Sequence, residues 1–81
     1  MNKEIPQQVK NAARFLINMY GEQIEYIGKY QDFDVYQYIF PENTATGFPF
    51  LFLYKNDLEE VQEITGFETF DIIMVAKGLK K

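Results

Sequence analysis

The first twenty residues carry apolar side chains at helical spacing. Pro6 suits the first position of a helix, and Gly21 suits the position just after its end. Between them the polar residues fall on one side, and the apolar residues fall on the other side. We therefore expect a helix from Pro6 to Tyr20 that lies with one face on a core. Its expected apolar side consists of Val9, Ala12, Ala13, Leu16, Ile17 and Tyr20, widened by Phe15 and Met19.

Two segments rich in β-branched and aromatic residues follow, at 23–30 and 33–40. They are separated by Gln31 and Asp32. If these two residues form a tight turn, Lys29 lies across from Asp34, and the opposite charges favour this register. We therefore expect a β-hairpin.

The same register assigns side chains to the two faces of the hairpin, because successive residues of a strand point to opposite sides. It places Ile27, Tyr36 and Tyr38 on the face away from the main core. There they would form an exposed apolar patch and a candidate binding surface. A slip of one residue would exchange the two faces.

Two further strands are predicted after the polar loop at 41–47. Residues 48–55 are apolar at almost every position, as in a strand covered on both faces. Asn56 and Asp57 suit a tight turn, and residues 58–64 form a charged strand. We interpret its acidic residues as protection of a sheet edge against aggregation. These residues are Glu59, Glu60 and Glu63.

A second helix is predicted near the end of the sequence. Thr65 and Glu68 stand at the spacing of a capping box, and Gly78 suits a C-terminal stop after Lys77. This helix is apolar on nearly all sides. We expect one stripe to anchor it to the sheet, namely Phe67, Phe70 and Met74. The second stripe then needs another cover, and it consists of Ile72, Val75, Ala76 and Leu79.

Two interpretations of this second stripe remain open. The first helix could lie alongside and cover it within one molecule. Alternatively, the stripe could pair across a two-fold axis or receive a partner protein, and two-fold dimers are the commonest homo-oligomers.

The predicted fold is a single α+β domain over residues 1–81, with the order α-β-β-β-β-α. We expect a four-stranded, mainly antiparallel sheet with both helices packed on one face. A chain of this length forms one core. Aromatic residues, at 17%, are numerous enough to fill it.

Composition narrows the chemistry of the chain. The sequence contains no His, Cys or Ser, so Ser–His–Asp and Cys–His catalysis and imidazole or thiolate metal sites are excluded. No glycine-rich phosphate-binding pattern is present. We therefore expect no enzymatic activity, no cofactor and no metal.

Charge and hydropathy narrow the partners. The net charge is −4, and Arg14 is the only arginine, which argues against nucleic-acid binding. The apolar runs are shorter than a membrane span, so we expect no membrane partner. The absence of cysteine and a polar N-terminal segment favour a cytoplasmic location.

The segment from Gly47 to Asn56, with the charged strand and helix after it, resembles the C-terminal hairpin and helix of thioredoxin-like domains. The chain has no Cys-x-x-Cys motif, and the strands before this segment do not follow that family's order. We interpret the resemblance as a shared hairpin-helix pattern that implies no redox function.

The favoured function is therefore a non-enzymatic protein-interaction module, whose partner is an unidentified protein or a second copy of the chain. The alternative is a small-ligand or regulatory domain with a pocket between the helices and the sheet. The candidate interaction surface combines residues from the hairpin and from the last helix. These residues are Ile27, Tyr36, Tyr38, Ile72, Val75 and Leu79.

Overall fold

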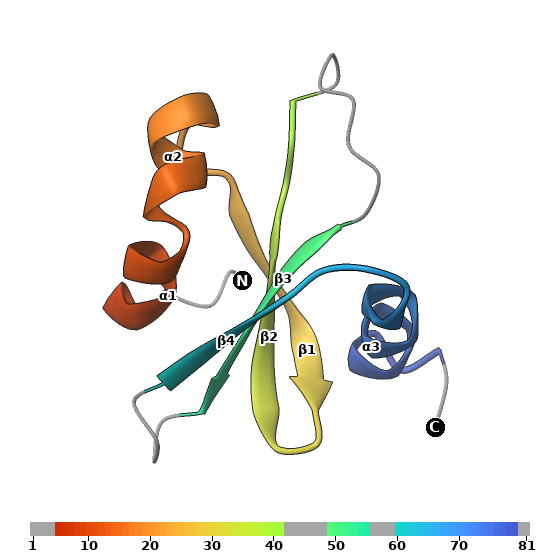
Figure 1. Cartoon of the computed structure of the whole chain (residues 1–81). Helices are drawn as coiled ribbons and strands as arrows, with labels where there is room; N and C mark the ends of the chain where they lie inside the picture. The colour runs from red at the N-terminus through yellow and green to blue at the C-terminus, as the bar shows by residue number, and fades with distance from the viewer. Residues whose placement is uncertain (1–4, 42–48, 56–59, 80–81) are drawn as a thin grey trace.

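The structure is a computed structural model that describes residues 5–41, 49–55 and 60–79. Within these ranges the element order is α-α-β-β-β-β-α, so the predicted α+β class is confirmed (Figure 1). The predicted turn at Asn56 and Asp57 lies outside the described residues, as does most of the predicted loop at 41–47. The elements are α1 (Gln7–Ala12), α2 (Arg14–Tyr20), β1 (Ile24–Tyr30), β2 (Phe33–Tyr38), β3 (Phe50–Lys55), β4 (Glu60–Ile64) and α3 (Glu68–Ala76).

The four strands form one sheet in the order β1-β2-β3-β4, and each neighbouring pair is antiparallel. The predicted hairpin is confirmed: Lys29 pairs with Asp34, and the two residues between the strands make the turn. Gln31 and Asp32 have φ values of 47° and 70°. Both therefore adopt the left-handed conformation that two-residue hairpin turns of this type require.

A bulge in β1 changes which side chains share a face. Near the turn, Gly28 pairs with Val35, whereas beyond the bulge Tyr26 pairs with Tyr36. Ile27 is the extra residue between these two pairs. Because the register shifts by one residue there, Tyr26 joins Tyr36 on one face, and Ile27 lies on the opposite face. The prediction that Ile27 shares a face with Tyr36 and Tyr38 is wrong.

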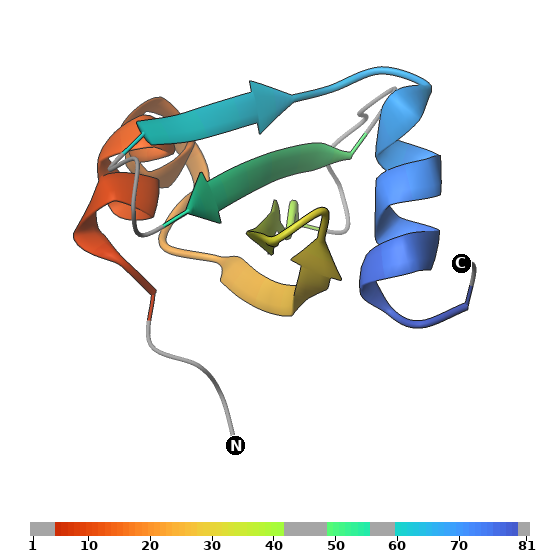
Figure 2. The same cartoon turned by 90° about the horizontal axis from the view of Figure 1, so that it is seen from below.

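The helices lie on opposite faces of the sheet (Figure 2). The helices α1 and α2 cover one face, and α3 covers the other, where it packs against β1. Under α1 and α2 the buried cluster is Val9, Ala13, Leu16, Tyr36, Tyr38, Phe52 and Tyr54. Under α3 it is Val35, Leu51, Leu53 and Ile72.

The prediction that both helices pack on one face is therefore wrong, and the reason lies in the central strands. β2 buries Tyr36 toward α1 and α2, and it buries Val35 toward α3. β3 alternates in the same way between Phe52 and Leu53. Two strands that are apolar on both sides require a cover on each side, so the domain has three layers.

The first helix differs from the prediction in one respect. It is divided at Ala13, whose φ of −92° and ψ of 7° end α1 and begin α2. Ala13 is buried, and both halves contribute to the same cluster through Val9 and Leu16. Gly21, with φ 102°, ends α2 as the sequence predicts.

At the two ends of α3, the predicted N-terminal cap is wrong and the predicted C-terminal stop is confirmed. The expected capping box is absent: α3 begins at Glu68 without a side-chain cap, and Thr69 Oγ1 donates to the Gly66 carbonyl oxygen at 2.6 Å. At the other end Gly78, with φ 78°, stops the helix as predicted. The Gly78 N–H donates to the Val75 carbonyl, and the Leu79 N–H donates to the Met74 carbonyl, as in a Schellman motif.

Candidate interaction surface

The structure buries three of the six side chains that the sequence suggested as an interaction surface and half-buries two more. Tyr36 and Tyr38 are 0% and 1% exposed, because α1 and α2 cover their face of the sheet. The predicted exposed tyrosine patch is therefore wrong. Ile27 is half-buried against the cluster under α3.

The residues predicted on the last helix have different positions. Ile72 is buried in the cluster under α3, and Val75 is half-buried. Leu79 is 67% exposed, so it is the one residue of the predicted set on the open surface. Ile73 and Ala76, beside Ile72, also pack against the sheet.

The stripe that we expected to anchor α3 points away from the sheet instead. Phe67, Phe70 and Met74 are 82%, 50% and 41% exposed. Their spacing of three and four residues places them on one side of the helix. Leu79 follows the C-terminal end of α3, where its N–H donates to the Met74 carbonyl at 2.8 Å. We call Phe67, Phe70 and Met74 the α3 outer face.

A close contact between backbones explains why α3 has this rotation. A Cβ placed on Gly28 of β1 would lie 1.9 Å from the Ala76 carbonyl oxygen, so the helix end approaches the strand where no side chain intervenes. The small Ala76 and the glycine together permit this approach. Because α3 is apolar on nearly all sides, its periodicity alone does not show which side makes the contact.

Elsewhere in the described structure, three other large apolar residues are exposed. On α2, Phe15 and Met19 are exposed. The Phe15 ring packs edge-on against the Phe50 ring, with the two ring centroids 5.9 Å apart. Ile39, just after β2, is exposed as well. The remaining outward residues of α1 and α2 include Gln7, Asn11 and other polar side chains.

The buried tyrosines have structural roles. Tyr38 Oη donates a hydrogen bond to the Leu16 carbonyl at 3.1 Å, and it also lies within hydrogen-bond distance of the Gly21 carbonyl. These contacts connect β2 to the middle of α2 and to the residue that ends it. Burial raises the pKa of Tyr38, and the neighbouring Tyr20 contributes to this rise. At neutral pH the phenol therefore stays protonated and acts as a donor.

Tyr36 differs from Tyr38 because its hydroxyl is buried without a hydrogen-bond partner among the described residues. Burial raises the pKa of Tyr36 to about 12, with a smaller contribution from Asp34. The nearby Tyr26 hydroxyl donates to Asp34 Oδ1 at 3.3 Å. A phenol with this pKa does not ionise near neutrality, so it offers no general base.

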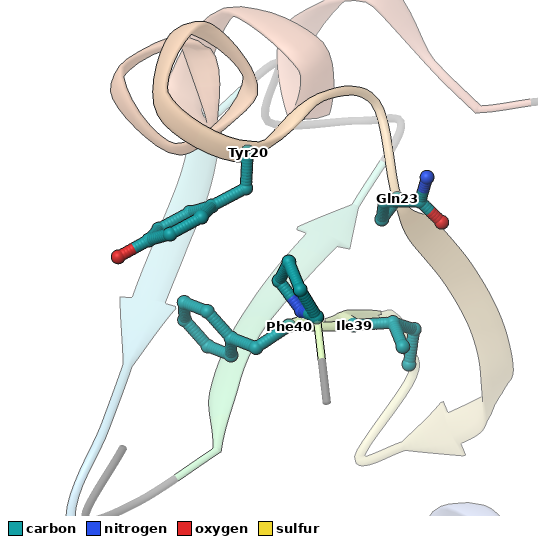
Figure 3. A pocket seen from close by; sticks show the side chains of 5 residues that line it. Tyr20, Gln23, Ile39 and Phe40 are labelled. Atoms are coloured by element: carbon teal, nitrogen blue, oxygen red, sulfur yellow. The ribbon is translucent and has the colours of Figure 1, made fainter. Parts of the chain in front are cut away.

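A small pocket lies at the end of α2 (Figure 3). Its volume is about 210 Å³, and the rings of Tyr20 and Phe40 stand 5.6 Å apart beside it. Pockets for small-molecule ligands generally measure about 300–1,000 Å³ and enclose most of the ligand. This one is smaller and partly open, so it gives little support to the ligand-binding alternative. Its lining residues are Tyr20, Gln23, Ile39, Phe40 and Pro41.

The described residues contain no cluster of acidic side chains able to hold a metal ion. Glu63 is exposed, Glu59 lies outside the described residues, and the side chain of Glu60 is not described. None of the helices in the described ranges is long and apolar enough to span a membrane.

Comparison with protein families, with curated proteins and with solved structures finds no match for this chain.

Proposed function

We propose that this chain is a non-enzymatic protein-interaction module that binds its partner through the α3 outer face. The observation that carries this proposal is the exposure of Phe67, Phe70 and Met74 on one side of a nine-residue helix. A contiguous apolar patch on a small soluble domain commonly marks an interaction site. Aromatic residues and methionine are also enriched at protein interfaces.

The composition supports the non-enzymatic part of the proposal. A chain without His, Cys or Ser lacks the side chains most used for nucleophilic and general acid–base catalysis near neutral pH. The two buried tyrosines with raised pKa values stay protonated there. A cytoplasmic protein partner agrees with the absence of cysteine from the sequence.

Site-specific photo-crosslinking tests the proposal. A benzophenone amino acid replaces Phe67 in one variant and Met19 in the control, and each variant is irradiated in cells of the source organism. Met19 is a matched control because it is 66% exposed but lies on α2, on the opposite side of the sheet. We expect a discrete crosslinked product from position 67 and none from position 19. Equal crosslinking from both positions, or none from position 67, would contradict the proposal.

A further inference from the structure

We infer that the pocket at the end of α2 binds a proline-rich segment of a partner protein in the polyproline II conformation. The described lining residues of this pocket belong to α2 and to the segments that flank β1 and β2, not to α3. The inference therefore concerns a second binding site and stands independently of the α3 outer face.

Three aromatic rings hold the walls of this pocket in place. The Phe40 ring packs edge-on against the rings of Tyr20 and Tyr38, with ring centroids 5.6 Å and 5.1 Å apart. Tyr38 is fixed in turn, because it is buried and its hydroxyl donates to the Leu16 carbonyl. Edge-on ring pairs are stabilising beyond the area that they bury. The aromatic part of the pocket is therefore formed before a partner binds.

Two side chains with hydrogen-bond donors stand on opposite sides of the pocket (Figure 3). One donor is the Tyr20 hydroxyl, and the other is the Gln23 amide. The backbone fixes the position of Gln23, since its carbonyl accepts from the Ile39 N–H at 2.7 Å and its N–H donates to the Gly21 carbonyl at 3.1 Å. Carbonyl groups of a bound segment can accept hydrogen bonds from both donors.

The size and charge of the pocket restrict its occupant. An apolar cavity of about 150 Å³ can hold a benzene molecule, so a pocket of about 210 Å³ has room for one ring-sized group. None of the described lining residues is charged. Glu22, next to Gln23 in the sequence, is paired with Lys10 at 3.2 Å. A neutral ring therefore suits the described walls better than a cation does.

Proline offers such a ring on an ordered backbone. A contact of one or two residues is too small to offset the cost of ordering a flexible segment. A polyproline II helix is already extended before it binds, and its carbonyls make no internal hydrogen bonds. Those carbonyls find donors at Tyr20 and Gln23. Aromatic-lined grooves are the usual receptors of proline-rich segments.

Nuclear magnetic resonance of the full chain tests the inference with a peptide of about nine prolines. We expect saturable shifts at the backbone amides of Tyr20, Gln23 and Ile39, with a dissociation constant on the order of 0.1–1 mM. A glycine–serine peptide of the same length should leave these signals unchanged, because it lacks both the rings and the ordered backbone. Absence of saturable shifts with the proline peptide, equal shifts with both peptides, or shifts confined to α3 overturn the inference.

Two variants carry the same change of charge at different places. Gln23→Glu replaces the amide donors by a carboxylate, and it should weaken binding of the proline peptide about two- to tenfold. Gln62→Glu is the matched control and should leave the affinity unchanged, because this exposed residue lies on β4, the edge strand opposite to β1. Equal effects of the two substitutions overturn the inference. The spectrum of each variant also shows whether it is folded.

The second donor is tested by removing the Tyr20 hydroxyl alone. Tyr20→Phe keeps the ring and its packing, and it should weaken binding about two- to tenfold. If Gln23→Glu and Tyr20→Phe both bind the proline peptide as the wild type does, the pocket is not its site and the inference is wrong.

Two further probes test other occupants of the pocket. Tetramethylammonium presents a cation, and N-acetylphenylalanine amide presents one aromatic side chain on a flexible backbone. If either probe shifts the same amides at a lower concentration than the proline peptide does, the inference is wrong.

The outcomes at the pocket and at the α3 outer face can be told apart. Met74→Glu should leave binding of the proline peptide unchanged, because Met74 does not line the pocket. Failure of the proline peptide leaves the crosslinking prediction at position 67 intact. Met19 stays a suitable control there, since it does not line the pocket and lies about 100° around the helix from Tyr20.

Discussion

Replacing Gly28 with alanine should detach the end of α3 from the sheet. The new Cβ would lie 1.9 Å from the Ala76 carbonyl oxygen and 2.7 Å from the Ala76 carbonyl carbon. Both atoms belong to the backbone, so no side-chain rotation relieves the overlap. The helix end must move away from β1, which loosens the contacts of Ile72 and Ile73 with the sheet. Overpacking of this kind costs about 1–3 kcal/mol.

The conformational cost must be separated from this overlap. Gly28 has φ 141°, a value that residues with a Cβ rarely adopt, and such strain costs about 1–3 kcal/mol. Gly66 provides a matched control, because its φ is 109° and a Cβ there would meet nothing within 4 Å. Gly66→Ala should therefore lose about 1–3 kcal/mol. Gly28→Ala should lose about 1–3 kcal/mol more than the control.

Urea denaturation followed by far-UV circular dichroism measures both losses. A domain of 81 residues is stable by about 4–12 kcal/mol, so Gly66→Ala should give a usable transition, and Gly28→Ala gives one when the wild-type stability exceeds about 6 kcal/mol. Hydrogen exchange provides a second readout, and we expect faster exchange at α3 amides in Gly28→Ala than in Gly66→Ala. Free energies of unfolding that agree within about 0.5 kcal/mol would refute the argument from the Gly28–Ala76 contact.

Three further predictions concern the tyrosines and the hairpin turn. Tyr36→Phe should leave the free energy of unfolding unchanged or raise it by about 1 kcal/mol, because it removes a buried hydroxyl without a described partner. Tyr38→Phe should lower the free energy of unfolding by about 1–2 kcal/mol, because the hydrogen bond to the Leu16 carbonyl of α2 is lost. The opposite order of the two variants in urea denaturation contradicts both assignments. The pKa of Tyr36 is raised from 10.0 to about 12, so above pH 10 the folded state keeps a proton that the unfolded state releases. As the pH rises from about 9 to about 11, the free energy of unfolding of the wild type should therefore fall by about 1.3 kcal/mol more than that of Tyr36→Phe. The double substitution Gln31→Asn and Asp32→Gly should raise the free energy of unfolding by about 0.5–1 kcal/mol and raise the melting temperature, because Asn and Gly adopt the positive φ angles of this turn more readily. An unchanged or lower melting temperature argues against this turn geometry.

Features that depend on local chemistry could be predicted from the sequence. The hairpin turn and the pairing of Lys29 with Asp34 followed from residue type and charge alone. The helix stops at Gly21 and Gly78 followed from the conformational freedom of glycine. The antiparallel pairing of four strands also agrees with the prediction, whereas the order of the strands in the sheet was not predicted.

Features that depend on long-range packing could not be predicted in this way. The bulge at Ile27 leaves no mark in the alternation of apolar residues, since both faces of β1 carry them. The rotation of α3 depends on the contact between Gly28 and Ala76, which lie far apart in the sequence. One register shift and one helix rotation together changed which candidate residues reach the surface.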